Sequence, residues 1–164
     1  MSSYTFVTSQ IPTLVWGRLS PGADPILSIA DLANEIGADS GTIVQCMGSL
    51  QKATFLIAKP DEEKGWRFSD PIVKEGPMEF LSAQGSWGRD ALTGEIVVHM
   101  HGFVVDSDGM AHGGHFIPGQ SRVMATCEVT LLTGPGITIR RRFDPVAGTA
   151  VLQPQPRILA DSPA

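Results

Sequence analysis

The chain has 164 residues, of which 42% are hydrophobic and 18% are charged, and its net charge is −5 at pH 7. These values predict one globular domain with a buried core and exclude a disordered chain. The acidic charge argues against a general binder of nucleic acid or anionic membranes, because such proteins present a basic surface.

The N-terminal segment MSSYTFVTSQ has no basic stretch followed by an apolar run, so it does not resemble a secretory signal. No segment approaches the roughly 18 uninterrupted apolar residues of a membrane span. The two cysteines, Cys46 and Cys127, form no C-x-x-C pair, and we interpret both as reduced core residues. We therefore expect a cytoplasmic protein with no membrane partner.

One helix is predicted near the start of the chain. Asp24 is a suitable N-cap, Pro25 suits the first helical position, and Gly37 can end the helix in a left-handed conformation. The apolar residues between them follow helical spacing and define one packed face. They are Ile26, Ile29, Ala30, Ala33 and Ile36.

Most other segments are short, rich in Val, Ile, Thr and Phe, and bounded by glycine or proline, which predicts strands of a mainly antiparallel sheet. Residues 60–77, PDEEKGWRFSDPIVKEGP, are polar with three prolines, and we interpret them as a surface loop or a lid. Residues 154–164 also carry three prolines, so we predict a single domain over 1–153 and a flexible C-terminal tail over 154–164. The predicted strands are 4–8, 13–19, 41–48, 52–58, 78–87, 94–105, 121–132, 136–143 and 149–153.

All four histidines of the chain fall within residues 99–115, HMHGFVVDSDGMAHGGH. On a strand, His99 and His101 point to the same side with their Cα atoms roughly 6–7 Å apart. The D-S-D-G stretch can reverse the chain, and the two glycines before His115 allow it to return beside the first two histidines. His112 lies three residues earlier and is a possible fourth ligand.

Three converging imidazoles form a site for Zn²⁺ or a related divalent ion, with zinc as the expected ion. Such an ion keeps a coordination position open, so it can acidify a water molecule or polarise a carbonyl group. The alternative is that each imidazole is an ordinary core or surface side chain satisfied by its own hydrogen bonds.

Three further residues are candidates for contacts with a bound ligand. Arg141, in I-R-R-R-F, either turns inward to hold a carboxylate or phosphate, or is a solvated charge of an edge strand. Arg18 has the same two interpretations. Trp87, in Q-G-S-W-G, is either a packing residue or a flat surface for a ligand.

Several stretches together resemble the PPC domain, the plant and prokaryote conserved domain. They are RLSPGADPILSIADLANEIGADSGTIVQCMGSLQKATF (18–55), FLSAQGSW (80–87), HMHGFVVDSDGMAHGGH (99–115) and IRRRFDPVAG (139–148). The resemblance implies a compact α+β domain, a mainly antiparallel sheet with one or two packed helices, that assembles as a homotrimer.

The resemblance also implies site residues. The metal ligands would be His99, His101 and His115, while His112 stands where the family usually has an aliphatic residue. Arg18 falls on the family's opening arginine and Arg141 on its closing-strand arginine. Plant members act in the nucleus through an AT-hook and a G-R-F-E-I-L stretch, but this chain has no hook and reads GPMEFL at 76–81.

Three functions follow from these observations. The first is a trimeric zinc-like metal protein whose three-histidine site takes a small anionic metabolite, with hydrolytic or lyase-type chemistry and an arginine as anchor. The second is a non-enzymatic module that binds a metal, a small ligand or a partner protein. The third, DNA-associated regulation, is disfavoured by the acidic charge and the missing hook.

Overall fold

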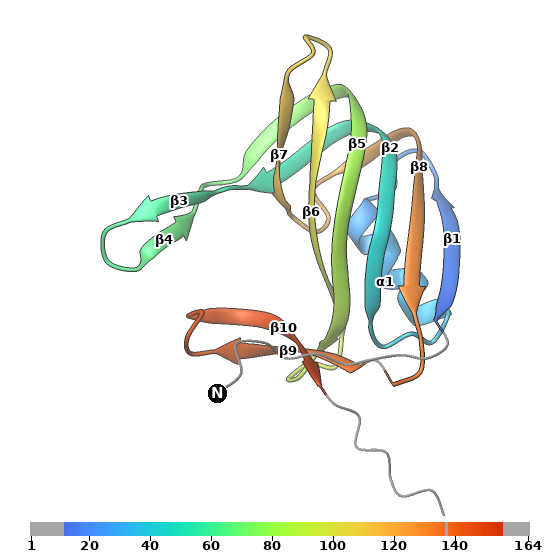
Figure 1. Cartoon of the computed structure of the whole chain (residues 1–164). Helices are drawn as coiled ribbons and strands as arrows, with labels where there is room; N and C mark the ends of the chain where they lie inside the picture. Colours follow the sequence, from blue (N-terminus) through green and yellow to red (C-terminus); the bar gives the residue numbers. More distant parts are fainter. Residues whose placement is uncertain (1–11, 137, 156–164) are drawn as a thin grey trace, which may run out of the picture.

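A computed structural model describes residues 12–136 and 138–155, which form one large sheet, a small hairpin and, within these residues, one helix (Figure 1). The helix is α1 (Pro25–Glu35). The strands are β1 (Thr13–Leu19), β2 (Gly41–Leu56), β3 (Ala58–Asp61), β4 (Gly65–Phe68), β5 (Ile72–Asp90), β6 (Ile96–Asp106), β7 (Ala111–Phe116), β8 (Arg122–Thr133), β9 (Thr138–Asp144) and β10 (Thr149–Gln155). The mainly antiparallel α+β architecture is as predicted.

The main sheet has the strand order β1-β8-β2-β7-β6-β5-β9-β10, and β2 also pairs with β5. The long strand β2 follows β5 for most of its length and meets β7 at its end, where Leu56 lies opposite His115. β2, β5, β6 and β7 therefore form a closed circuit of hydrogen-bonded neighbours. The pair β5–β9 is parallel, and the other pairs are antiparallel.

One face of the sheet is covered by α1 and carries the core. The largest fully buried side chains on it include Trp87, Phe80 and Phe116, and Ile29 and Ala33 of the helix join the same apolar cluster. Cys46 and Cys127 are buried there as free thiols with their sulfur atoms 3.3 Å apart. Their mutual contact and burial raise the pKa of the Cys46 thiol, which fits the predicted role as reduced core residues.

We call the opposite side of the sheet the outer face. A row of directly opposed residues crosses it from β1 to β6: Leu14, Leu132, Thr42, Ser86 and His99. Because directly opposed residues of antiparallel strands share a face, the histidines of β6 lie on the outer face with the exposed side chains of β1. Large apolar side chains are exposed on this face: Leu14, Trp16, Val44, Met47 and Phe103.

The helix begins as predicted. The Asp24 carboxylate accepts a hydrogen bond from the backbone N–H of Leu27 at 3.0 Å, and Gly37 follows the helix with a φ of 66°. Ile36 was predicted on the packed face, but it is the C-cap residue and is 39% exposed. It leaves the packed face because the helix has already ended at Glu35.

Two segment predictions were wrong. The strands expected at 41–48 and 52–58 are one strand, β2. Bulges near Gly48 and Leu50 shift the register of its pairing with β8, but the pairing continues on both sides of them. The loop or lid expected at 60–77 is instead the β3–β4 hairpin and the first part of β5. Its turn forms because the Asp61 carboxylate accepts hydrogen bonds from the backbone N–H groups of Glu63 and Lys64.

The predictions for the two ends of the chain can be compared with the structure only in part. The strand expected at 4–8 lies outside the described residues. β10 continues to Gln155, two residues beyond the predicted domain end, and residues 156–164 of the predicted tail lie outside the described part. No helix in residues 12–136 and 138–155 is long and apolar enough to cross a membrane.

Candidate metal centre

The imidazoles of His99, His101 and His115 converge on the outer face of the sheet. One ring nitrogen of each lies within 4.8 Å of the corresponding nitrogens of the other two. Nε2 of His101 is central: it lies 2.9 Å from Nε2 of His99 and 3.2 Å from Nδ1 of His115. The predicted convergence is therefore present within one chain.

The strands place these three rings by simple register. His99 and His101 are separated by two positions on β6, and His101 lies directly opposite His115 of β7. The turn between the strands is held by Asp106, whose carboxylate accepts hydrogen bonds from the backbone N–H groups of Asp108 and Met110. Gly109 completes it with a φ of 77°.

Glycine before His115 is required by close packing of strands. A Cβ atom at Gly114 would collide with the carbonyl oxygen of Leu56 on β2, and one at Gly113 would collide with backbone of β6. These two glycines therefore let β7 lie tightly between β6 and the end of β2. That position delivers His115 to the other two imidazoles.

The donor set fits a divalent ion that prefers nitrogen ligands. Tetrahedral zinc with Zn–N bonds of about 2.0–2.1 Å places its nitrogen ligands about 3.3–3.4 Å apart, close to the two shortest separations here. Within the described residues, the only side-chain hydrogen-bonding partners of these rings are one another. The rings are therefore not occupied individually by other polar groups.

Partial desolvation and the neighbouring imidazoles favour the neutral form of two of these rings. Desolvation lowers the pKa of His115 to about 4, with further contributions from His99 and His101. Desolvation and the neighbouring His101 also lower the pKa of His99. Since a histidine must be neutral to bind a metal, these two rings are ready ligands near neutral pH.

His112 does not belong to this cluster. It faces the opposite side of β7, where its Nε2 lies 2.6 Å from Oδ2 of Asp106. The hydrogen bond from His112 is the largest of the contacts that lower the pKa of the Asp106 carboxyl. Its role in the structure is to stabilise the β6–β7 turn, and the possibility of a fourth ligand is not supported.

Two groups of side chains, here called walls, flank the histidines, and neither was predicted from the sequence. On one side Phe68 of β4 packs against His115 with a ring-centroid distance of 5.4 Å, and Trp66 packs edge-on against Phe68 at 5.2 Å. On the other side Ser86 and Gln84 of β5 lie directly opposite His99 and His101. The aromatic alternation in G-W-R-F was the signal for the first wall.

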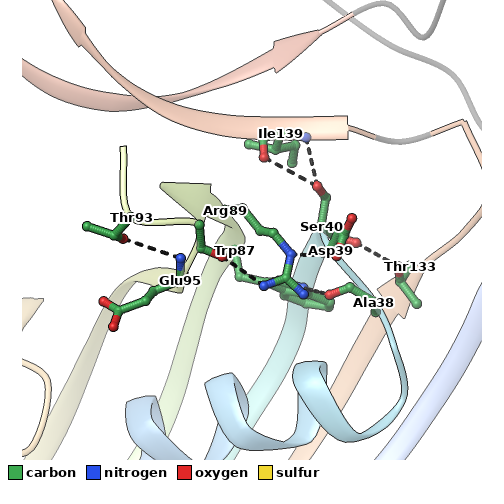
Figure 2. Close-up of polar contacts among 10 residues, drawn as sticks. Ala38, Asp39, Ser40, Trp87, Arg89, Thr93, Glu95, Thr133 and Ile139 are labelled. Carbon is green, nitrogen blue, oxygen red and sulfur yellow. Dashed lines mark hydrogen bonds and ion pairs between the residues drawn. The ribbon is translucent and has the colours of Figure 1, made fainter. Parts of the chain in front are cut away.

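The other three candidate residues lie away from the histidines. Trp87 is fully buried, and its Nε1 donates a 3.0 Å hydrogen bond to the carbonyl oxygen of Ala38, so its indole packs the core and has no open face (Figure 2). Arg141 donates to the Asp90 carboxylate at 3.0 Å. Arg18 is exposed on β1, on the outer face but across four strand spacings from β6, about 19 Å.

A second ion pair between an arginine and an aspartate lies near the same end of β5. Arg89 donates from Nε to the Asp39 carboxylate at 2.6 Å (Figure 2), and from Nη1 to the carbonyl oxygen of Gly94. Like Arg141, this arginine is held at the end of β5 that lies beyond Ser86. Both arginines are therefore held by carboxylates of the same chain, and within the described residues neither makes a hydrogen bond to the three histidines.

Comparisons with known proteins agree with this architecture. Residues 7–134 match the family model of the Plants and Prokaryotes Conserved (PCC) domain. The chain is 32% identical over 139 residues to the bifunctional protein GlmU of Synechococcus sp. (strain JA-2-3B'a(2-13)), an alignment that covers 85% of this chain and 20% of that protein. The chain thus spans about a fifth of the length of the curated relatives it matches.

Solved structures share the fold at low sequence identity. A metal-containing protein from Archaeoglobus fulgidus superposes with a TM-score of 0.77 at 23% identity, covering 92% of this chain and 99% of that one. A PPC protein from Pyrococcus horikoshii gives 0.71 at 20% identity, over 93% and 97% of the two chains. A candidate DNA-binding protein from Ralstonia eutropha JMP134 gives 0.69 at 24% identity, over 84% and 89%.

Proposed function

The chain belongs to the Plants and Prokaryotes Conserved (PCC) domain family, and from this premise we propose that it is a metal-binding protein. Its three histidines, His99, His101 and His115, hold a zinc-like divalent ion. The ion serves a site for a small anionic metabolite, with hydrolytic or lyase-type chemistry, and the protein acts as a homotrimer. The observation that carries the proposal is the 4.8 Å convergence of three imidazole nitrogens.

The chemistry of the donor set supports zinc over harder ions. Three imidazoles suit Zn²⁺ and related transition metals, whereas Mg²⁺ and Ca²⁺ prefer oxygen ligands. An ion with three protein ligands supplies Lewis acidity at an open coordination position. The relative from Archaeoglobus fulgidus, 23% identical to this chain, is a metal-containing protein, which supports a metal at this site but does not bear on the choice of ion.

The protein's own residues around the ion define what a ligand meets. Ser86 and Gln84 offer neutral hydrogen-bonding groups on one side, and Phe68 offers an aromatic ring on the other. These side chains orient a ligand and do not carry charge. An anionic ligand would therefore be bound mainly by the metal and by any cation that a neighbouring subunit contributes.

The exposed apolar side chains of the outer face support the trimer. Leu14 and Trp16 on β1 are 65% and 67% exposed, and Phe103 near the histidines is 46% exposed. In a cyclic trimer, two different patches of one surface meet each other, so the β1 edge of one copy packs against a different part of the next. Arg18 lies beside this β1 patch, and a neighbouring copy can place it near a metal-bound ligand.

Metal analysis of purified variants tests the proposal. Wild-type protein grown with added zinc is expected to contain about one ion per chain, and His99→Ala, His101→Ala and His115→Ala less than about a tenth of that. His112→Ala is the matched control, because this histidine shares β7 with His115 but contacts Asp106. Equal metal content in all four variants and the wild type would overturn the assignment.

Two other functions remain as second candidates. A non-enzymatic ligand-binding module is favoured by the match to about a fifth of the length of GlmU, where this domain accompanies other segments. A zinc-dependent rise in melting temperature without turnover of any tested substrate supports that reading. DNA association is favoured by the two solved relatives described as DNA-binding, from Ralstonia eutropha JMP134 and Bacteroides thetaiotaomicron, and is opposed by the net charge of −5.

A further inference from the structure

The β3–β4 hairpin has one apolar face and one charged face. Lys59 lies directly opposite Arg67 on the charged face. The residues of the other face alternate with these two and pair with one another across the hairpin: Ala58 with Phe68 and Pro60 with Trp66. Because side chains alternate along a strand, the four apolar residues share one surface.

This apolar face is turned toward the metal centre. Phe68 contacts the ring of His115 at a centroid distance of 5.4 Å and an interplanar angle of 45°. Trp66 stands nearly perpendicular to Phe68, at 87°. In Figure 1 the hairpin extends away from the sheet on the side of β7, the strand that carries His115. The two rings thus form an angled aromatic wall beside the three histidines.

The wall is open to a ligand in the isolated chain. Trp66 is 43% exposed and Phe68 is 42% exposed. A two-stranded hairpin with large exposed aromatic rings gains stability when another apolar surface covers those rings. Phe68 already contacts the metal ligand His115. The apolar part of a molecule bound to the metal would therefore lie against the exposed rings of Phe68 and Trp66 and cover them.

The opposite wall selects the polar end of such a molecule. Ser86 and Gln84 are uncharged, and Gln84 donates from Nε2 to the hydroxyl oxygen of Ser82 at 2.9 Å. Among the ion pairs of the described residues, those of Arg89 and Arg141 lie three and four residues beyond Ser86 on β5, about 10–13 Å along the strand. The walls around the histidines therefore offer neutral hydrogen bonds and aromatic surface.

We propose that Trp66 and Phe68 form a specificity subsite for a planar ring. The ligand of this metal centre is then a small aromatic acid that binds the metal through oxygen atoms. The acid group binds the metal, and the ring packs against the two aromatic side chains. This proposal rests on the proposed metal centre and names its ligand class. Phe68 also positions His115, but the subsite is defined by contact with the ligand.

Two hydroxamates that differ only in one substituent test the subsite. Acetohydroxamate and benzohydroxamate offer the same two oxygen donors to a metal, with a methyl or a phenyl group attached. The protein is loaded with Co²⁺, and each probe is titrated while the visible absorption bands of the ion are followed. We expect benzohydroxamate to bind at least about tenfold more tightly, because an aromatic packing contact alone is worth about that factor.

The variants Phe68→Ala and Trp66→Ala are each expected to reduce this preference to below about threefold. Phe143→Ala is the matched control, because this phenylalanine is 67% exposed and lies on β9. It should keep the tenfold preference. Light scattering of every variant reports whether the hairpin rings are buried by a second copy.

The outcomes separate this proposal from the metal centre itself. Cobalt bands in the wild type with equal affinities for the two probes overturn the aromatic subsite alone. A preference that persists in both Phe68→Ala and Trp66→Ala also overturns it. Equal affinities together with a lower mass for these two variants assign the rings to an interface between copies. Absence of cobalt bands in the wild type contradicts the metal centre, and the subsite falls with it.

Discussion

Replacing His101 by alanine is the most informative perturbation of the metal centre, because His101 is the ligand shared by both short contacts. Its Nε2 lies 2.9 Å from His99 and 3.2 Å from His115. The side chain itself is exposed. The substitution should therefore leave the stability of the metal-free protein nearly unchanged, within about 0.5 kcal/mol, while it removes the centre of the ligand set.

The expected magnitude follows from mass action. Zinc at 100 times its dissociation constant stabilises the wild type by about 2.7 kcal/mol, which raises the melting temperature of a domain of this size by about 5–11 °C. Mutation of a residue that only orients a metal ligand typically lowers metal affinity about 10–100-fold. Loss of a ligand itself should therefore lower zinc affinity by at least about 100-fold. The same zinc concentration then stabilises His101→Ala by only about 0.4 kcal/mol, or about 1–2 °C.

The assay is thermal unfolding of wild type, His101→Ala and His112→Ala, each with EDTA and with zinc. The metal-free melting temperature of His112→Ala should fall because the hydrogen bond to Asp106 is lost. Its zinc-dependent rise should equal that of the wild type. A full zinc-dependent rise in His101→Ala would refute the reasoning, because it would place the metal elsewhere.

Three further predictions concern the scaffold of the site. In EDTA, the free energy of unfolding should fall as the pH drops from about 6.5 toward 4. The pKa values of His99 and His115 are lowered in the folded protein, so the unfolded chain takes up protons at these residues first. A melting temperature that does not change over this pH range would contradict the prediction. Gly114→Ala should destabilise the protein by about 1–3 kcal/mol in urea unfolding and reduce its metal content, because the new Cβ meets the Leu56 carbonyl. Asp24→Ala should cost about 1 kcal/mol by loss of the helix cap and leave the metal content unchanged.

The core of the candidate site was predictable from the sequence because it depends on local rules. Side-chain alternation on a strand placed His99 and His101 together, and the turn residues with the following glycines returned His115 to them. Alternation also explains the exclusion of His112. It lies three positions from His115, so on one strand the two side chains must face opposite sides.

The same alternation could have placed Trp87 in the core. Trp87 follows Ser86, which lies opposite His99 on the outer face, so the indole must point to the buried side. What no local rule could supply is its hydrogen bond to Ala38, a residue 49 positions away. Long-range partners of this kind depend on the whole strand order.

The hairpin was missed because its two signals compete. Trp66 and Phe68 alternate with Arg67, which is typical of a strand, but the surrounding prolines and charges indicate a loop. Pro60 is tolerated because β3 pairs on one side only, with β4. No strand on the other side of β3 needs a hydrogen bond from the backbone nitrogen of residue 60. The ring of Phe68 packs against that of His115, which lies on a strand far away in the sequence. This contact could not be predicted from the local sequence.

The most direct test of the metal centre is anomalous diffraction from zinc-soaked crystals at the zinc absorption edge. We expect a peak about 2.0–2.1 Å from Nε2 of His99, Nε2 of His101 and Nδ1 of His115. The same histidines without a peak, in crystals saturated with zinc, or a peak held instead by His112 and Asp106, would contradict it.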